Sequence, residues 1–284
     1  MMYARKHIAP KILQRRIPVF PNAPLPADLP PVHTLVSKHD WLLSMWMLSS
    51  WSHSTKRNWD IVIHEDGSLG NSEISAICQA VPGVQIIRRN IADSAMAPVL
   101  EGMPRCLDYR QRMPHGLKCF DVPHFARSSR FFLIDPDVLF FREPTQMLAW
   151  ADSETDPTCW FNRDPQEPSP ISQESAQSEY GIDLWRQVNS GLCLLDRGAI
   201  DYHQMETWLG HTDLAEGNQW RVEQSLLVLA CSQRGEGGLL PGEYEVSLTK
   251  NHVHPDPVSR HYVGAVRHRF FGEGVAQLRK VLLS

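Results

Sequence analysis

The chain has 284 residues, of which 42% are hydrophobic, so it is long enough for one large α/β domain or two small ones with a substantial core. Lysine and arginine number 28 against 32 aspartates and glutamates, and this slight acidic excess argues against a nucleic acid as the main partner. No apolar stretch approaches the length of a membrane-spanning helix.

The cysteines are scattered without the close pairs that are typical of zinc sites. Several lie in apolar segments, and their positions are 78, 106, 119, 159, 193 and 231. We interpret them as reduced thiols in or near the core, which favours a cytoplasmic location. Basic residues near the start, among them Arg5 and Lys6, leave peripheral contact with a membrane surface open, although a solvated tail is the simpler interpretation.

The first part of the chain predicts an arm followed by alternating strands and helices. Residues 17–31 contain six prolines, so we expect residues 1–31 to form a proline-rich arm and residues 32–284 to form one domain. Apolar periodicity then predicts strands at 32–37, 60–64 and 84–88, with helices at 41–51 and 72–80. This order is typical of a Rossmann-like half with a parallel sheet between helices.

The second part of the domain continues with mixed patterns. A helix broken by Pro114 is expected from residue 108 to the proline at 123, and residues 94–106 are ambiguous. The polar segment 162–180 predicts a mobile surface excursion. Further strands are expected at 131–134, 158–162 and 188–196, and further helices at 143–150, 198–210, 218–233 and 275–283. A glycine-rich turn is expected at 235–242, and Trp220 is a core candidate.

The stretch Arg130–Phe141, RFFLIDPDVLFF, places two carboxylates at the end of an apolar run. Residues 131–134 are typical of a strand buried on both faces in the middle of a parallel sheet. Pro136 has no N–H for a sheet hydrogen bond, so Asp135 and Asp137 should lie at the carboxyl edge, where open α/β sheets bind ligands. Two such carboxylates suit a hard divalent cation, although an ordinary turn after a core strand explains the same residues.

Three further segments form an ordered pattern with the two aspartates. They are Asn189-Ser190-Gly191 before an apolar strand, Glu223-Gln224 on a helix, and HYVGAVR from His261 to Arg267. Together the four segments resemble the Asp-x-Asp, Asn-x-Gly, acidic-Gln and His-x-x-Gly-x-x-Lys motifs of GT-A type glycosyltransferases, most closely the family-8-like group. The resemblance covers residues 32 to 270, with arginine in place of the last lysine.

The resemblance implies a GT-A fold with a mostly parallel central sheet flanked by helices, and a metal-dependent transfer of sugar from a nucleotide-diphosphate sugar, with a UDP-sugar favoured. It implies that Asp135, Asp137 and His261 hold Mn²⁺ or Mg²⁺. Which histidine of the tail binds the metal stays open, because the tail also contains His252, His254 and His268.

The resemblance also implies which residues meet the donor. Asn189 and Gln224 would bond sugar hydroxyls, and Glu223 would be a sugar ligand, or a base if the enzyme inverts, with retention favoured. The candidates for binding the nucleotide and diphosphate are Thr34, Ser37, Asp66, Arg110, Lys118, Asp135, Gly264 and Arg267. Asp66 is equally explained by a turn, and the basic residues by an exposed helix face. Trp160 or Trp220 would stack on a sugar or belong to the core.

Two other interpretations compete with a glycosyltransferase. The first is a catalytically inactive nucleotide-sugar-binding protein or scaffold on the same fold, which the presence of both aspartates and His261 disfavours. The second is another metal-dependent nucleotide enzyme, such as a nucleotidyltransferase. That class usually has a glycine-rich basic loop after its first strand, and SKHDWLL at residues 37–43 is not such a loop. The acceptor, whether carbohydrate, lipid-linked or protein, is not indicated.

Overall fold

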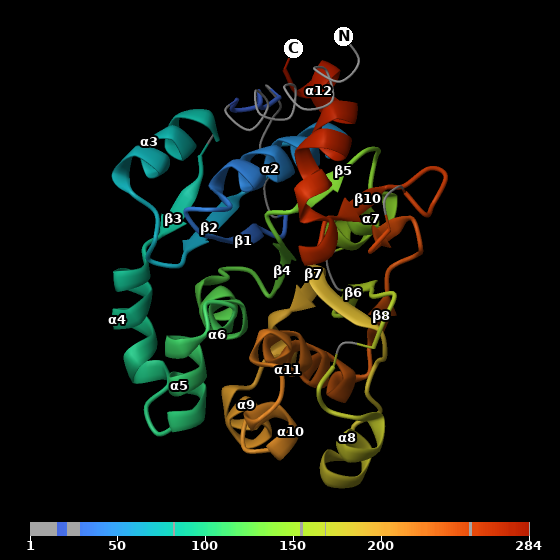
Figure 1. The fold of residues 1–284 in the computed structure, drawn as a ribbon. Helices are drawn as coiled ribbons and strands as arrows, with labels where there is room; N and C mark the ends of the chain where they lie inside the picture. Colours follow the sequence, from blue (N-terminus) through green and yellow to red (C-terminus); the bar gives the residue numbers. More distant parts are fainter. Residues whose placement is uncertain are drawn as a thin grey trace.

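A computed structural model describes residues 16–21, 29–81, 83–153, 156–167, 169–249 and 252–283. A seven-stranded sheet in the order β3-β2-β1-β4-β7-β6-β8 forms the centre, and a three-stranded sheet, β5-β10-β9, stands beside it (Figure 1). The predicted α/β fold with a mostly parallel sheet between helices is confirmed. Within the described residues, no helix combines the length and apolar character needed to cross a membrane.

The first half of the sheet is parallel, as the alternating pattern predicts. Strand β1 pairs in parallel with β2 on one side and with β4 on the other, and β2 pairs in parallel with β3. The elements of this half are β1 (Val32–Val36), α2 (Trp41–Thr55), β2 (Ile61–Glu65), α3 (Asn71–Ala80), β3 (Gln85–Ile87), α4 (Arg89–Val99), α5 (Pro104–Arg112), α6 (Gly116–Phe125) and β4 (Arg130–Ile134).

The second half adds antiparallel strands and the small sheet. Strand β7 runs antiparallel to both β4 and β6, so its first residues lie at the edge where β1 and β4 end. The elements are β5 (Val138–Phe140), α7 (Thr145–Asp152), β6 (Cys159–Arg163), α8 (Gln173–Tyr180), β7 (Val188–Asp196), α9 (Tyr202–Trp208), α10 (Thr212–Ala215), α11 (Gln219–Arg234), β8 (Gly237–Leu239), β9 (Tyr244–Val246), β10 (Ser259–His261) and α12 (Ala276–Leu282).

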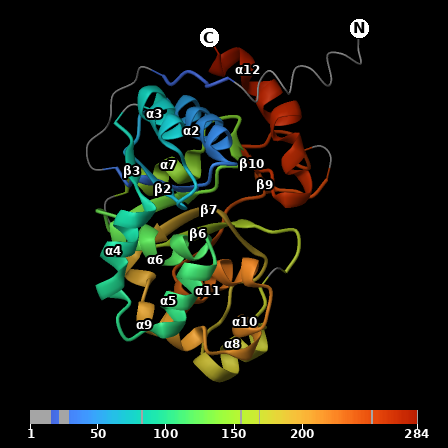
Figure 2. The same cartoon turned by 60° about the vertical axis from the view of Figure 1, so that its left-hand side comes forward.

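Apolar layers fill both faces of the central sheet. One core includes Phe131, Leu133 and side chains of α5, α6, α9 and α11, and the other includes Phe132, Ile134 and side chains of α2 and α7. Successive residues of β4 therefore enter opposite cores, as expected for a strand buried on both faces. Figures 1 and 2 both show α12 beside α2, at the opposite end of the molecule from α8, α9 and α10.

Several predictions of local structure are wrong. Pro123 lies inside α6, although we expected the helix to end before it. Helix α8 within the predicted surface excursion at 162–180 was not predicted; it ends at Gly181 in the left-handed conformation that favours glycine. Strands β8, β9 and β10 were not predicted, because their residues, GGL, YEV and SRH, do not form an apolar run. The proposed arm, residues 1–31, lies largely outside the described residues.

The small sheet places β10, from the C-terminal part of the chain, beside the residues that follow β4. Strand β10 pairs antiparallel with β5, and this pairing sets His261 opposite Val138. The backbone N–H of Tyr262 donates to the carbonyl of Asp137 at 2.9 Å. Because β5 begins directly after Asp137, the register of this pairing brings His261 next to the two aspartates.

A pair of buried histidines joins β1 to β2 on the face away from α2. His33 Nδ1 lies 2.9 Å from His64 Nε2, and both rings are fully or almost fully buried. Burial disfavours the charged imidazolium, and it lowers the pKa of His64 from 6.5 to about 3. One ring must donate and the other accept, so the pair is stable while both rings are neutral.

Acidification should therefore destabilise the folded chain. In the unfolded state His64 takes up a proton below pH 6.5, whereas the folded state resists protonation until about pH 3, so stability falls as the pH drops through this window. We expect His64 to account for a loss of about 2 kcal/mol between pH 6.5 and 5. Urea unfolding measured at several pH values should show a shallower pH dependence for His64→Leu. The exposed His203→Leu is the control, and equal slopes for all three proteins would contradict the prediction.

Candidate functional site

A cavity of about 870 Å³ opens at the edge where β1 and β4 end and β7 begins. Its walls come from residues after β1, β2 and β4, from the start of β7, from helices α6 and α11, and from the segment after β10. The volume lies within the range of ligand-binding clefts. Strand ends meet here because β1, β2 and β4 are parallel while β7 runs the opposite way.

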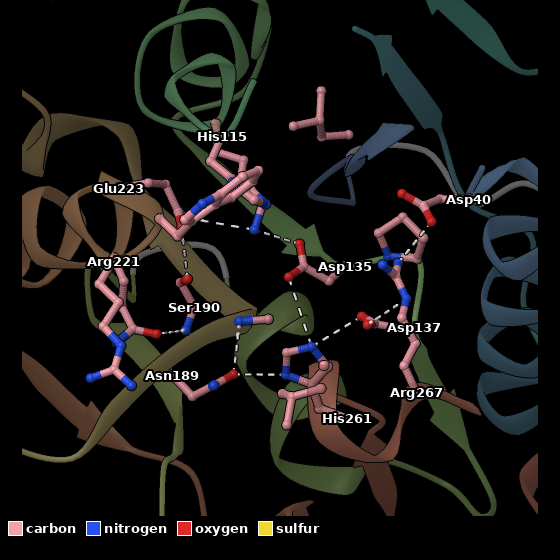
Figure 3. Close-up of a pocket in the computed structure, with 18 of the residues that line it drawn as sticks. Asp40, His115, Asp135, Asp137, Asn189, Ser190, Arg221, Glu223, His261 and Arg267 are labelled. Atoms are coloured by element: carbon pink, nitrogen blue, oxygen red, sulfur yellow. Dashed lines mark hydrogen bonds and ion pairs between the residues drawn. The ribbon is translucent and has the colours of Figure 1, made fainter. Parts of the chain in front are cut away.

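Three side chains in the cavity could hold a metal ion. Asp135, Asp137 and His261 each offer one ligand atom, and these atoms lie within 4.8 Å of one another. His261 Nε2 is 3.0 Å from Asp137 Oδ1 and 3.8 Å from Asp135 Oδ2 (Figure 3). Two carboxylates and one imidazole are a donor set that suits Mn²⁺ or Mg²⁺, so the residues present fit the ion that the fold implies.

Asp137 and His261 stabilise each other's charged forms. Burial disfavours ionisation of Asp137, but the neighbouring His261 and Arg267 outweigh it and hold the pKa of Asp137 below its ordinary value. Burial likewise opposes a charged His261, yet Asp137 raises the pKa of His261 above 6.5. A divalent ion would replace the imidazolium proton as the positive partner of the carboxylates.

Asn189 fixes the orientation of the His261 ring. Its Oδ1 accepts from the backbone N–H of Gly191 at 3.0 Å, and its Nδ2 donates to Asp164 at 2.9 Å, so the amide cannot be reversed without losing both bonds. His261 Nδ1 lies 2.8 Å from the same Oδ1 and must therefore donate to it. In the neutral ring this leaves the lone pair on Nε2, which faces both aspartates, as a metal ligand requires.

Gly191 provides the space for that ring. A Cβ built on Gly191 would lie 2.1 Å from His261 Cε1 and 2.2 Å from Nδ1. No side chain larger than hydrogen fits between β7 and the imidazole. The Asn-x-Gly pattern thus has a physical explanation here: the asparagine holds the histidine, and the glycine makes room for it.

Lys118 forms ion pairs with two acids that line the cavity, Asp135 and Glu223. Its Nζ lies 2.6 Å from Asp135 Oδ1 and 3.7 Å from Glu223 Oε1, and its side chain is 3% exposed. Burial disfavours the charged ammonium, but Asp135 and Glu223 outweigh it and raise the pKa of Lys118. Burial, with Lys118 opposing it, raises the pKa of Glu223 to about 7. The predicted candidate Lys118 therefore lies in the site, in contact with one of the proposed metal ligands.

The acidic-Gln pair on α11 is anchored to β7. Glu223 Oε2 accepts from the Ser190 hydroxyl at 3.1 Å, and Gln224 Oε1 accepts from the Ser190 backbone N–H at 3.0 Å. Both side chains line the cavity within one turn of the helix. Ser190, which we did not single out, thus sets the position of α11 relative to the strand.

Arg267 lines the cavity and pairs with two acids. It pairs with Asp40 at 2.9 Å and with Asp137 at 3.2 Å, which joins the C-terminal segment to the loop before α2. Gly264 lines the same wall, and no atom lies within 4 Å of the place that a Cβ would occupy on it. Ser37 and Asp66, which follow β1 and β2, also line the cavity.

Two of the predicted donor-binding residues lie outside the cavity lining. Thr34 is fully buried on the face of β1 that packs against α2, because side chains alternate along a strand and Leu35 and Ser37 take the cavity side. The guanidinium of Arg110 is buried and engaged by Asp121, at 2.6 and 2.8 Å, and by Asp93. The structure therefore does not bring Thr34 and Arg110 together with the other candidates at the cavity.

The structure also shows which of the two candidate tryptophans and which of the tail histidines line the cavity. Trp220 was expected in the core, but its side chain is 62% exposed and lines the cavity, whereas Trp160 does not line it. Among the tail histidines only His261 lines the cavity; His252 lies 3.5 Å from Glu245 instead. Sequence reasoning missed several lining residues that stand in turns or helix starts without a pattern, namely His39, Asp40, His115, Asp164, Gln166 and Arg221.

Comparisons with known proteins agree with this fold. No protein-family model and no curated protein matches the sequence. Among solved structures, the galactosyltransferase LgtC, in complex with donor and acceptor sugar analogs, is similar with a TM-score of 0.53 at 13% identity, over 89% of this chain and 96% of that chain. The chain has the GT-A glycosyltransferase fold.

Two further glycosyltransferases share the fold over part of their length. The bifunctional glycosyltransferase WbbM is similar with a TM-score of 0.53 at 13% identity over 87% of this chain, which spans about half of WbbM, 48%. GlyE of Streptococcus pneumoniae TIGR4 is similar with a TM-score of 0.50 at 11% identity, over 89% of this chain and 62% of GlyE. These likenesses establish the GT-A fold, and the site residues must carry any argument about activity.

Proposed function

We propose that the protein is a metal-dependent glycosyltransferase that moves a sugar from a nucleotide-diphosphate sugar to an acceptor. The observation that carries this proposal is the convergence of Asp135, Asp137 and His261 at the sheet edge of a GT-A fold. We propose Mn²⁺ or Mg²⁺ as the ion and a UDP-sugar as the favoured donor. The ion would neutralise the negative charge that develops on the leaving diphosphate.

The chain's own residues can bind the diphosphate beside that ion. Arg267 is 40% exposed, and its guanidinium has planar donors that suit phosphate oxygens. Arg267 pairs with Asp40 and Asp137. A bound phosphate would replace these acids as the partner of the guanidinium. The open space at Gly264 lets a phosphate approach the backbone. Ser37 and Asp66, on the wall formed by β1 and β2, are our candidates for the ribose and base.

The sugar would lie between Lys118 and α11. We assign Gln224 to sugar binding, and we assign Asn189 primarily to orienting His261, since both ends of its amide are engaged within the protein. Glu223 is engaged by Ser190 and Lys118 rather than directed at an acceptor. This supports retention of configuration, in which no protein base is needed and a leaving phosphate oxygen takes the acceptor proton.

We further propose that residues 32–284 act as one glycosyltransferase domain preceded by the arm, with the 162–180 segment at the surface. A cytoplasmic location is also a proposal, supported by the six free cysteines, five of which are buried. Nothing in the site favours an inactive scaffold, because the acids, the histidine and the arginine that the chemistry needs all line one cavity.

Calorimetric titration with UDP-, GDP- and ADP-sugars, with and without Mn²⁺, tests the proposal. We expect one nucleotide to bind at least about tenfold more tightly with the ion, because protein carboxylates and phosphates would share it. Slow hydrolysis of the bound donor by water would then separate an enzyme from a scaffold. If no nucleotide gains affinity from the ion, the proposed function is wrong.

A further inference from the structure

Trp220 is an exposed indole at the cavity. Of the large hydrophobic side chains exposed in the described part of the chain it is the only aromatic one, with 62% of its surface accessible. It lines the same cavity as the candidate metal ligands, and Leu248, 40% exposed, lines that cavity too. Burying an indole is strongly favourable, so an exposed one in a cleft indicates a surface that a ligand completes.

One ring of the protein packs against the indole. His115 packs against it edge-on, with ring centroids 5.1 Å apart and an interplanar angle of 75°. The backbone N–H of Trp220 donates to the side chain of Asn218, which caps α11. His115 is half-buried, and this burial together with Lys118 lowers its pKa to about 4, so it is a neutral partner near pH 7. A fixed aromatic platform loses little conformational freedom on binding.

Trp220 lies on α11 one helical turn before Gln224, the residue that we assign to sugar binding. Glu223 and Gln224 follow at i+3 and i+4, so all three side chains lie on one face of the helix. One turn corresponds to about 5 Å along the axis, roughly the length of one sugar ring. Figure 3 shows His115 and Glu223 on one side of the cavity, with Asp137, Arg267 and Asp40 on the other. The indole thus lies on the side remote from the residues assigned to the nucleotide.

The polar side chains that line the cavity with Trp220 indicate what kind of ligand binds there. Asp164 and Gln166, after β6, line the cavity with Gln224, and these groups exchange hydrogen bonds with hydroxyls. A pyranose has an apolar C–H face for an aromatic ring and hydroxyls at its rim. A lipid chain would offer no acceptor to the side-chain amide N–H groups of Gln166 and Gln224. We infer that Trp220 is the stacking platform of the acceptor subsite and that the acceptor is a neutral glycan. This inference rests on the proposed function.

Ligand-observed NMR can test the subsite with lactose, maltose and cellobiose as probes, in the presence of UDP and Mg²⁺. We expect saturation transfer to at least one disaccharide with the wild-type protein, about tenfold weaker binding with Trp220→Ala, and partial recovery with Trp220→Phe. UDP affinity should be the same in all variants. Ile91→Ala, which removes another exposed apolar side chain outside the cavity lining, is the control and should not change sugar binding.

The outcomes separate this inference from the proposed function. If no nucleotide binds the wild-type protein more tightly with the ion, both the proposed function and the acceptor subsite are overturned. Normal UDP binding with no disaccharide bound, or with equal binding by Trp220→Ala, would overturn the acceptor subsite alone. Vesicles of phosphatidylcholine and phosphatidylglycerol form a further arm: binding to them that depends on Trp220 would assign the indole to a membrane surface instead.

Discussion

Replacement of Asp137 by asparagine should abolish the metal dependence of nucleotide binding. The amide removes the charge that faces both His261 and Arg267, at 3.0 and 3.2 Å, and leaves two basic groups without their shared acid. A divalent ion would then have one carboxylate instead of two. We expect the affinity for Mn²⁺ with UDP to fall by about 100-fold or more, and donor hydrolysis to fall to background. Calorimetry with and without Mn²⁺ measures the effect.

Asp108→Asn is the matched control for this prediction. Asp108 forms an exposed ion pair with Arg112 on α5, so the same chemical change there should leave nucleotide binding unaffected. Urea unfolding of both variants would show whether Asp137→Asn is folded under the titration conditions. Folded Asp137→Asn protein with unchanged ion-linked binding would contradict the assignment of Asp137 as a metal ligand.

A methyl group at position 191 should displace His261. The Cβ of Gly191→Ala would lie within about 2 Å of the ring, which is far closer than any real contact, and β7 is buried along its whole length. If the ring moves, it loses the bond to Asn189 and its approach to Asp137. We expect Mn²⁺ affinity to fall by about 10- to 100-fold and stability to fall by about 1–3 kcal/mol.

A double-mutant cycle isolates this cause. If the destabilisation comes from the clash, then Gly191→Ala should cost much less stability in a His261→Ala background, because the ring is gone. Gly242→Ala is the control, since no atom lies within 4 Å of its Cβ position. Equal costs of Gly191→Ala in both backgrounds would show that His261 is not the obstacle.

Much of the sheet could be predicted from local patterns. The strands near 32–36, 61–65 and 130–134 are short segments rich in β-branched, leucine and aromatic residues between turn signals, a composition that favours strands. The position of Asp135-Pro136-Asp137 at a strand end also followed from local chemistry, since proline ends the ladder. Strands β9 and β10 contain tyrosine, serine and charged residues without an apolar run, so the pairing of β10 with β5 and β9 is visible only in the structure.

The sequence by itself determined the α/β class and the position of the two aspartates at an edge of the sheet. The tertiary structure alone decided which residues join them. His261 was selected over three other histidines by the register of β10 on β5, which depends on residues more than one hundred positions apart. The alternation of side chains along β1 places Thr34 outside the cavity lining, and a buried ion pair with Asp121 does the same for Arg110. Trp220 fits a core pattern, yet it lies at the cavity because α11 begins there. Each outcome depends on long-range packing, which a local pattern does not encode.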